Sequence, residues 1–423
     1  MTSLNPTTLQ IIAAILFAVA IIHTFSTKYF EHLAHTQPTH NGLWHLLGEV
    51  EIVFGFWALV LAATMVVVES TESMKAYVSS RDFTEPLFTF VSMVVAASKP
   101  ILQTAKRLVE LLAKLIPGAG GIPAYFIVMT LVPLLGSFIT EPAAMTLAAL
   151  ILAEQFFSRN ITAKFKYATI GVLFVNISIG GTLTAYAAPP VLMVAGTWNW
   201  DTVFMLTNFG WKAAVAVFVN GLAVTLLFAK ELTNLQTAKN PDAETLSVPM
   251  PLIIVHITIL TGIILFTHYP PVFIGLFMLF MGIATAYPAH QDQLILREGL
   301  LVAFFLGGLV VLGGQQQWWL QPLLVNMSSD AVFFGATALT AITDNAALTY
   351  LGSLVEGLSD EFKYSLVAGA VTGGGLTIIA NAPNPAGVAI LRRYFDEGSV
   401  SPAGLLVSAL LPTLVALLAF RYL

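Results

Sequence analysis

Long apolar runs separated by short polar stretches dominate this chain of 423 residues. Several runs approach the roughly 20 residues that a helix needs to cross the hydrocarbon core of a bilayer. The pattern therefore predicts spanning helices in both halves of the chain, with a polar, turn-rich linker at 230–249 between the halves. The expected spans are 8–26, 46–68, 86–102, 167–195 and 204–229, followed by 250–268, 272–287, 298–315, 364–391 and 402–420.

Two further apolar segments, 122–157 and 331–355, are each interrupted near the middle by polar residues. The interruptions are T-E-P-A-A-M-T, from Thr140 to Thr146, and T-D-N-A-A-L-T, from Thr343 to Thr349. Lipid cannot satisfy free backbone groups, so irregular backbone at membrane depth has to be buried in protein. We therefore expect each segment to form a re-entrant hairpin with its polar tip inside the protein.

The two spans that follow the hairpins contain a second pair of matching motifs. The first is G-G-T-L-T-A-Y-A-A-P-P, from Gly180 to Pro190, and the second is G-G-G-L-T-I-I-A-N-A-P, from Gly373 to Pro383. Glycine and proline interrupt these helices at corresponding places, which is the sequence mark of a transporter binding site. The helices at about 167–195 and 364–391 are therefore expected to be broken.

The repeated order of hairpin and broken helix indicates an internal duplication. Each half has an odd number of spans, so the second copy must enter from the opposite face of the membrane. The predicted fold is an all-α polytopic membrane protein of two inverted-topology repeats, each with five spanning helices, one re-entrant hairpin and one broken helix. The repeats are expected at 1–229 and 250–423, joined by a cytoplasmic linker at 230–249.

The distribution of basic residues predicts the orientation of the chain in the membrane. Only 10% of the residues are charged and 57% are hydrophobic, far from the composition of a soluble domain. On the predicted topology most basic residues fall on one side, which the positive-inside rule makes cytoplasmic, so both termini are expected outside the cytoplasm. The chain has no cysteine, which excludes thiolate metal sites, and no basic face that would bind nucleic acid.

The two hairpin tips each carry an acidic residue, Glu141 and Asp344. A carboxylate at membrane depth costs about 3 kcal/mol on insertion scales and is by default a functional residue. The alternative is structural, with Asp344 capping the returning half-helix and Pro142 standing at the start of its counterpart. Two acids at matched positions favour a cation or proton site.

The broken helices add oxygen ligands. Hard cations bind oxygen, and unwound backbone next to half-helices exposes carbonyl groups. The polar candidates beside the breaks are Thr182, Thr184, Thr377, Asn381 and Asn384. The alternative is a pair of proline kinks with satisfied caps. Asn381 and Asn384 have no counterpart in the first copy, so the two half-sites are expected to be unequal.

Other polar residues are assigned to the surface. Lys99 is expected to extend toward the cytoplasmic interface, with pairing to Glu141 as the alternative. Glu49 and Glu51 begin a span and are expected to face the cytoplasmic surface. The histidines of residues 32–45 could sense pH, although a solvated loop accounts for them as well.

These motifs resemble those of the ion transporter superfamily, which includes NhaD-type sodium/proton antiporters, arsenite permeases and divalent anion/sodium symporters. The chain is most similar to the bacterial sodium/proton antiporter family. The resemblance implies a homodimer with an elevator-type mechanism, and Na⁺ bound by Glu141, Asp344 and neighbouring backbone carbonyls. The residues that it places at the sodium site are Thr140, Glu141, Thr182 and Thr184 in the first half, and Thr343, Asp344, Asn345, Thr377 and Asn381 in the second. The symporter branch has a Ser-Asn-Thr tip that this chain lacks.

The predicted function is exchange of Na⁺ or Li⁺ for H⁺ in a bacterial inner membrane, with no cofactor beyond the transported ions. The partners are then small inorganic ions and the lipid bilayer. The first alternative is sodium-coupled transport of a small anion such as a dicarboxylate or arsenite, since helix N-termini can bind anions. An enzyme is not expected, because H-E-x-x-H and G-x-S-x-G motifs are absent. A channel would leave the duplicated acidic breaks unexplained.

Overall fold

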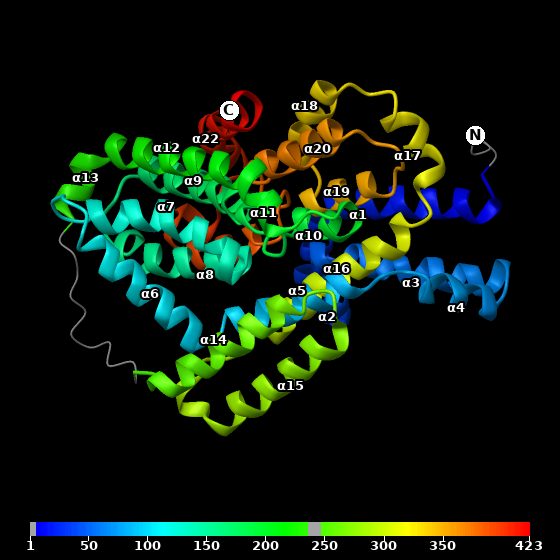
Figure 1. Ribbon diagram of the computed structural model, residues 1–423, viewed down its shortest axis with the longest axis horizontal. Coiled ribbons are helices and arrows are strands. Elements are labelled where there is room, and N and C mark those ends of the chain that lie inside the picture. Colours follow the sequence, from blue (N-terminus) through cyan, green and yellow to red (C-terminus); the bar gives the residue numbers. More distant parts are fainter. Residues whose placement is uncertain (1–5, 236–246) are drawn as a thin grey trace.

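The computed structural model describes residues 6–235 and 247–423, and within these ranges the chain forms helices and loops without any strand (Figure 1). Residues 236–246, the middle of the predicted linker, lie outside the described part. The helices of the first half are α1 Thr8–Thr36, α2 Asn41–Leu47, α3 Val50–Val68, α4 Thr71–Ser79, α5 Thr84–Ala96, α6 Lys99–Ala113, α7 Ile122–Ile139, α8 Glu141–Leu152, α9 Ala163–Gly180, α10 Pro189–Trp198, α11 Thr202–Met205, α12 Trp211–Leu227 and α13 Ala229–Asn234. Those of the second half are α14 Met250–Leu265, α15 Pro270–Ala286, α16 Leu296–Gly313, α17 Gln317–Leu324, α18 Ser329–Thr340, α19 Asn345–Ser353, α20 Asp360–Gly373, α21 Asn384–Leu391 and α22 Pro402–Tyr422.

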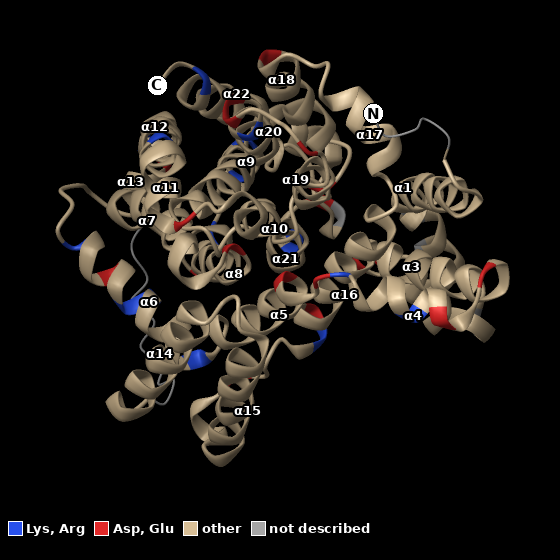
Figure 2. Ribbon diagram, turned by 45° about the vertical axis from the view of Figure 1, so that its right-hand side comes forward, with Lys and Arg blue, Asp and Glu red and all other residues tan. Residues whose placement is uncertain are grey.

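The helices have the length and composition of membrane spans. Among the described residues, 7 helices are long and apolar enough to cross a bilayer, and the bent pair α5 and α6 raises the number to 8. Helices α14 and α15 carry no charged residue and are only slightly shorter, with 16 and 17 residues (Figure 2). A multi-pass, all-helical membrane protein is therefore confirmed. The five-span plan of each repeat, its inversion and the re-entrant course of the two hairpins stay predictions.

Local sequence explains where the key helices begin. Thr162 and Ser359 cap α9 and α20 by accepting hydrogen bonds from Phe165 and Phe362 backbone N–H groups. Helices α8, α10 and α21 instead begin with proline in their first turn, where the missing N–H has no intrahelical partner to lose. Helices α9 and α20 end at Gly180 and Gly373, so glycine ends one helix and proline starts the next at both breaks.

The span predicted at 86–102 is wrong in one respect, because it is two helices. Helix α5 ends at Ala96, and α6 starts at Lys99 with a bend of 64° between them. Pro100 accounts for the new start, since proline suits the first turn of a helix and has no N–H with which to continue the hydrogen bonds of α5. Lys99 forms an ion pair with Asp292 at 3.2 Å. Its predicted alternative, pairing with Glu141, is therefore wrong.

The hairpins and broken helices of the two halves pack across each other. Helices α7 and α8 pack together and α7 lies on α9, whereas α18 lies on α20. The second helix of each hairpin also packs across the halves: α8 packs on α21 of the second half as well as on α9, and α19 packs on α10 of the first half as well as on α20. In Figure 1 α8, α10 and α19 lie toward the middle of the molecule, and α14 and α15 lie at its lower edge, where they pack on α5. The two breaks therefore meet inside one block.

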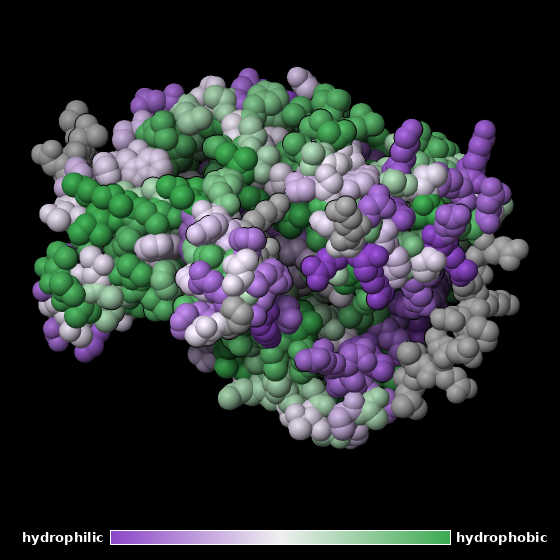
Figure 3. All heavy atoms as spheres, turned by 180° about the vertical axis from the view of Figure 1, so that it is seen from behind, coloured by the Kyte–Doolittle hydropathy of each residue, from purple (hydrophilic) through white to green (hydrophobic). Residues whose placement is uncertain are grey.

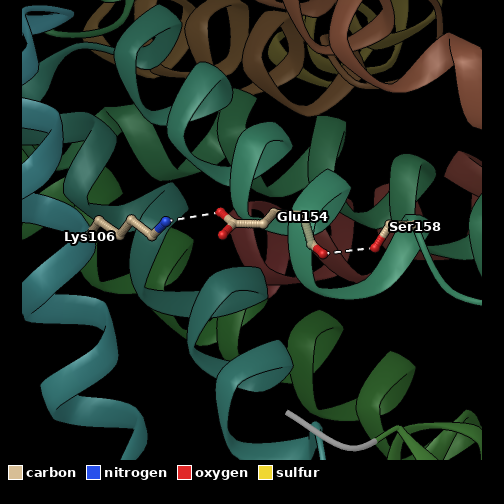
Figure 4. A network of polar contacts seen from close by, with 3 residues as sticks. All are labelled: Lys106, Glu154 and Ser158. Atoms are coloured by element: carbon tan, nitrogen blue, oxygen red, sulfur yellow. Dashed lines mark hydrogen bonds and ion pairs between the residues drawn. The ribbon is translucent and has the colours of Figure 1, made fainter. Parts of the chain in front are cut away.

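The surface is mostly apolar, as lipid contact requires. Figure 3 shows broad hydrophobic areas, with hydrophilic side chains gathered toward one end of the molecule. Near the surface, Lys106 of α6 donates a hydrogen bond of 2.9 Å to the Glu154 carboxylate (Figure 4). The Ser158 hydroxyl donates to the Glu154 backbone carbonyl beside it. Lys166 similarly donates to the Tyr394 carbonyl at 2.7 Å. Basic groups from distant parts of the chain thus hold loops and helix ends together at the surface, where each pair adds at most about 1 kcal/mol.

Candidate functional site

The tip of the first hairpin places Glu141 in the interior. Glu141 is 0% exposed and stands in the first turn of α8. Its Oε2 accepts a hydrogen bond of 2.9 Å from the amide of Asn381, which belongs to the second broken helix. Its Oε1 has no hydrogen-bond partner. A buried carboxylate with a free oxygen is costly unless a proton or a cation completes it.

The first broken helix covers the same carboxylate from another side. A Cβ on Gly181 would lie only 2.3 Å from Glu141 Oε1, so the carboxylate packs directly on the glycine. Neighbouring Ser137 of α7 fixes this break, because its hydroxyl donates to the Gly180 carbonyl at 2.7 Å and accepts from the Leu183 N–H at 2.9 Å. Glu141 therefore packs on the unwound backbone of its own half at Gly181 and accepts a side-chain hydrogen bond from Asn381 of the other half.

The hairpin turn itself is strained. Thr140 has φ 73° and ψ 149°, a backbone region that almost only glycine adopts, at a cost of about 1–3 kcal/mol. Its hydroxyl is buried and has no hydrogen-bond partner. Tightly packed surroundings must hold this conformation: a Cβ on Gly136 of α7 would lie 3.3 Å from Ala144 and 3.7 Å from Glu141 Cα. This backbone conformation of Thr140 determines the orientation of the next residue, Glu141, at the start of α8.

The second hairpin contributes Asn345 and Asp344 in different ways. Asn345 is 0% exposed, and neither side-chain amide atom has a hydrogen-bond partner. Its backbone N–H donates to the Ala380 carbonyl at 3.1 Å, which attaches α19 to the second break. Asp344 is half-buried and caps α19, since Oδ1 accepts from the N–H groups of Ala346 and Ala347 at 2.8 and 3.1 Å. The predicted structural role of Asp344 is thus present, and its charge also acts on Glu141.

The second break holds two more amides. Asn384 donates to the carbonyls of Gly374 and Thr377 at 2.8 and 2.9 Å, and its Oδ1 is buried without a partner. Asn381 Oδ1 is likewise buried and unpartnered. A Cβ on Gly374 would lie 2.9 Å from Asn345 Nδ2. Asn381, which has no counterpart in the first copy, therefore contacts the carboxylate that the first copy supplies, and Asn384 holds the backbone of the same break.

The predicted threonines are positioned mainly by backbone. Thr182 and Thr184 are buried, and their hydroxyls donate to the carbonyls of Ile179 and Ser137 at 2.7 and 2.6 Å. Thr343 and Thr377 are half-buried and donate to carbonyls at the end of the second hairpin's first arm, Leu339 and Ala341. A hydroxyl that donates still offers lone pairs, so these oxygens keep the capacity to bind a cation.

The unpartnered oxygens define what the site can hold. Buried acceptors without partners gather at the tips and breaks, on Thr140, Glu141, Thr340, Asn345, Asn381 and Asn384. Each such group in a folded protein calls for a missing partner. In the described part of the chain no three His, Asp or Glu side chains converge as ligands of a metal ion. One carboxylate among amide and hydroxyl oxygens suits a monovalent cation better than a divalent one, because affinity for divalent ions depends on ligand charge.

Sequence reasoning missed three groups. Ser137 and Thr340 each precede a tip acid by four residues, a matched spacing that could have revealed them. Glu51 was assigned to the cytoplasmic surface, but it is half-buried in the first turn of α3, and its charge acts on Asp344. Glu49, two residues earlier, forms an ion pair with Arg297 of α16. No motif marks Glu51, since only the packing of α3 brings it toward the second hairpin.

Comparison with known proteins assigns the chain to a family. A protein-family model described as "Putative Na+/H+ antiporter" matches residues 8–423. The chain belongs to this family. The match includes the segments of both hairpins and both breaks, and the description of the family is that of a membrane transporter. A search of curated proteins gives no match.

Proposed function

We propose that the protein exchanges Na⁺ or Li⁺ for H⁺, and that Glu141 holds the cation and the proton in turn. The observation that carries the proposal is the fully buried Glu141 carboxylate, which has one unpartnered oxygen between two unwound helices. Cation binding favours the charged carboxylate and burial favours the neutral one, so one group can serve both ions. Competition for that group couples the two fluxes. The description of the family supports the same exchange.

The sodium-coupled anion carrier is not favoured. Its attraction lies in helix N-termini, which bind anions through free N–H groups. Two of those N-termini already have a carboxylate of their own. Glu141 occupies the first turn of α8, and Asp344 accepts the free N–H groups of α19. These acids would repel an anion at the hairpin tips and attract a cation.

The packing supports an elevator-type movement as part of the proposal. Each returning hairpin arm rests on the broken helix of the other half, so the four segments form a block suited to moving together. Helices α5 and α16 contact this block. Together with α3, which packs on α16, and with α14 and α15, which pack on α5, they would form the stationary scaffold. A homodimer held by that scaffold, a bacterial inner membrane and termini outside the cytoplasm complete the proposal.

The exchange assay uses everted vesicles that contain the protein and an established proton gradient. We expect Na⁺ and Li⁺ to dissipate the gradient, and K⁺ to do so far less, because the site offers few charged ligands and little room. Succinate added with Na⁺ should have no further effect. A gradient that is insensitive to Na⁺ and Li⁺, or sodium-driven accumulation of labelled succinate in vesicles of the opposite orientation, would contradict the proposal.

Asp344→Asn tests the charge at the second tip apart from the cap. Asparagine caps helices as well as aspartate, so the hydrogen bonds to Ala346 and Ala347 should remain and the protein should fold normally. We expect sodium-driven proton release to fall by about tenfold or more, since a charge that acts on Glu141 is lost. Asp344→Ala, which also removes the cap, should in addition lower the free energy of unfolding by about 0.5–2 kcal/mol. Full activity in Asp344→Asn would leave Asp344 with a structural role alone.

A further inference from the structure

A cavity of about 530 Å³ lies between the first break and the turn that joins α14 to α15. Ala185 and Tyr186 of the unwound segment line it on one side, and Thr267 and His268 line it on the other. We propose that this cavity is an access vestibule through which a hydrated monovalent cation passes between one membrane face and Glu141, and that Glu85 attracts the cation into it. The inference rests on the proposed antiport function and adds the route and a residue that controls affinity on one side.

The floor of the cavity leads toward the carboxylate. Tyr186 is half-buried, and its phenol interacts with the side chain of Thr184, which is only 2% exposed. The Thr184 hydroxyl donates to the Ser137 carbonyl at 2.6 Å, and the Ser137 hydroxyl holds the backbone on either side of Gly181. Gly181 in turn lies against Glu141. A series of neighbouring residues, Tyr186, Thr184, Ser137 and Gly181, thus leads from the cavity to the buried acid, with Tyr186 at the boundary.

The charges on the wall suit a cation. A Cβ on Gly196 would lie 3.6 Å from Glu85 Oε1 and 3.7 Å from His268 Cε1, so a carboxylate and an imidazole flank this exposed glycine of α10. Asp201 also lines the cavity and accepts the Phe204 N–H at 2.7 Å. No lysine or arginine is among the lining residues. A cleft with one sign of charge concentrates counter-ions at its floor.

Arg81, the basic residue nearest to Glu85 in sequence, contacts other groups. The Arg81 guanidinium lies over the Tyr77 ring at 4.8 Å and packs near Gly314. The volume of the cavity far exceeds the roughly 30 Å³ share of one water molecule. An ion can therefore enter with part of its hydration shell. Selection among cations would then take place at the buried oxygen atoms around Glu141, beyond Tyr186.

The absence of native cysteine allows a sided test by thiol modification. Single cysteines replace Asn199 or His268 in the vestibule, and Gln317→Cys, exposed at the start of α17, serves as the control. A positively charged, membrane-impermeant thiol reagent is applied to each side of oriented vesicles. We expect N199C and H268C to react from one side only, with the sodium KM on that side rising by about tenfold. Modification of Q317C should leave the KM unchanged.

Glu85→Gln provides the second measurement. We expect a sodium KM about three- to tenfold higher on the vestibule side, with an unchanged KM on the other side and an unchanged kcat. Two results would contradict the vestibule without contradicting antiport. One is exchange that is unaffected by modification of both vestibule cysteines, and the other is a change in the sodium KM of equal size on both sides of the membrane. A parent protein that exchanges no cation in the same vesicles would overturn the antiport function and the vestibule with it.

Discussion

Glu141→Gln is expected to abolish sodium-driven proton release and to leave the protein folded. Glutamine has nearly the same shape, and its carbonyl can accept the Asn381 amide as Glu141 Oε2 does at 2.9 Å. It cannot bind or release a proton, so no proton can be exchanged for a cation. The measurement is dissipation of a proton gradient in everted vesicles, together with thermal unfolding of the purified protein.

Glu141→Gln should leave thermal stability unchanged or raise it, although it abolishes exchange. Glu141 is 0% exposed, and a neutral amide is less costly to bury than a carboxylate, so the melting temperature should be unchanged or higher. Na⁺ should raise the melting temperature of the parent, because a ligand that binds only the folded state stabilises it, and should have no such effect on the variant.

Glu154→Gln is the matched control, on the π-helical turn that continues α8. Its carboxylate pairs with Lys106 at the surface (Figure 4). Loss of that exposed pair should cost at most about 1 kcal/mol and leave exchange intact. Residual sodium-dependent exchange in Glu141→Gln would remove Glu141 from the coupling mechanism.

Gly308→Ala should destabilise the whole fold. Helices α3 and α16 meet backbone to backbone here, and a Cβ on Gly308 would lie 2.3 Å from both the Gly55 nitrogen and the Phe54 carbonyl carbon. Because the close atoms belong to the backbone of α3, no side-chain rotation can relieve the contact with the added methyl group, and α3 and α16 must move apart. We expect the free energy of unfolding to fall by about 1–3 kcal/mol, the usual cost of overpacking.

The adjacent glycine offers a matched control for this prediction. A Cβ on Gly307 would have its nearest neighbour at 3.7 Å, an ordinary contact with Phe83. Gly307→Ala should therefore be neutral or slightly stabilising, because alanine is the better helix former. Thermal unfolding of both variants decides the matter. Equal melting temperatures for the two would show that the close approach of α3 and α16 is not required for stability.

The sequence was most informative where backbone chemistry is local. Pro142, Pro190 and Pro385 stand in the first turns of α8, α10 and α21, and proline restricts backbone wherever it occurs. These three helix starts could therefore be placed from the chain alone. The bend before Lys99 was missed although Pro100 signals it, because the apolar run continues through the bend.

Contacts between the halves could not be read in the same way. The hydrogen bond from Asn381 to Glu141 joins residues 240 positions apart, and no periodic pattern relates them. The resemblance placed each hairpin tip with the break of its own half. In the structure the Glu141 carboxylate contacts Gly181 of its own half and Asn381 of the other. Glu51 escaped notice for the same reason, since its approach to Asp344 depends on how α3 packs.

The contacts of α8 and α19 with the opposite half limit the number of conformations that the protein can adopt during transport. Were each hairpin held only by its own half, one half could face inward while the other faced outward, and such a hybrid would leak ions. Because α8 rests on α21 and α19 rests on α10, a hybrid would have to break both interfaces at once. Tight coupling of the two ion flows would then follow from mechanical interlocking and need no separate gate.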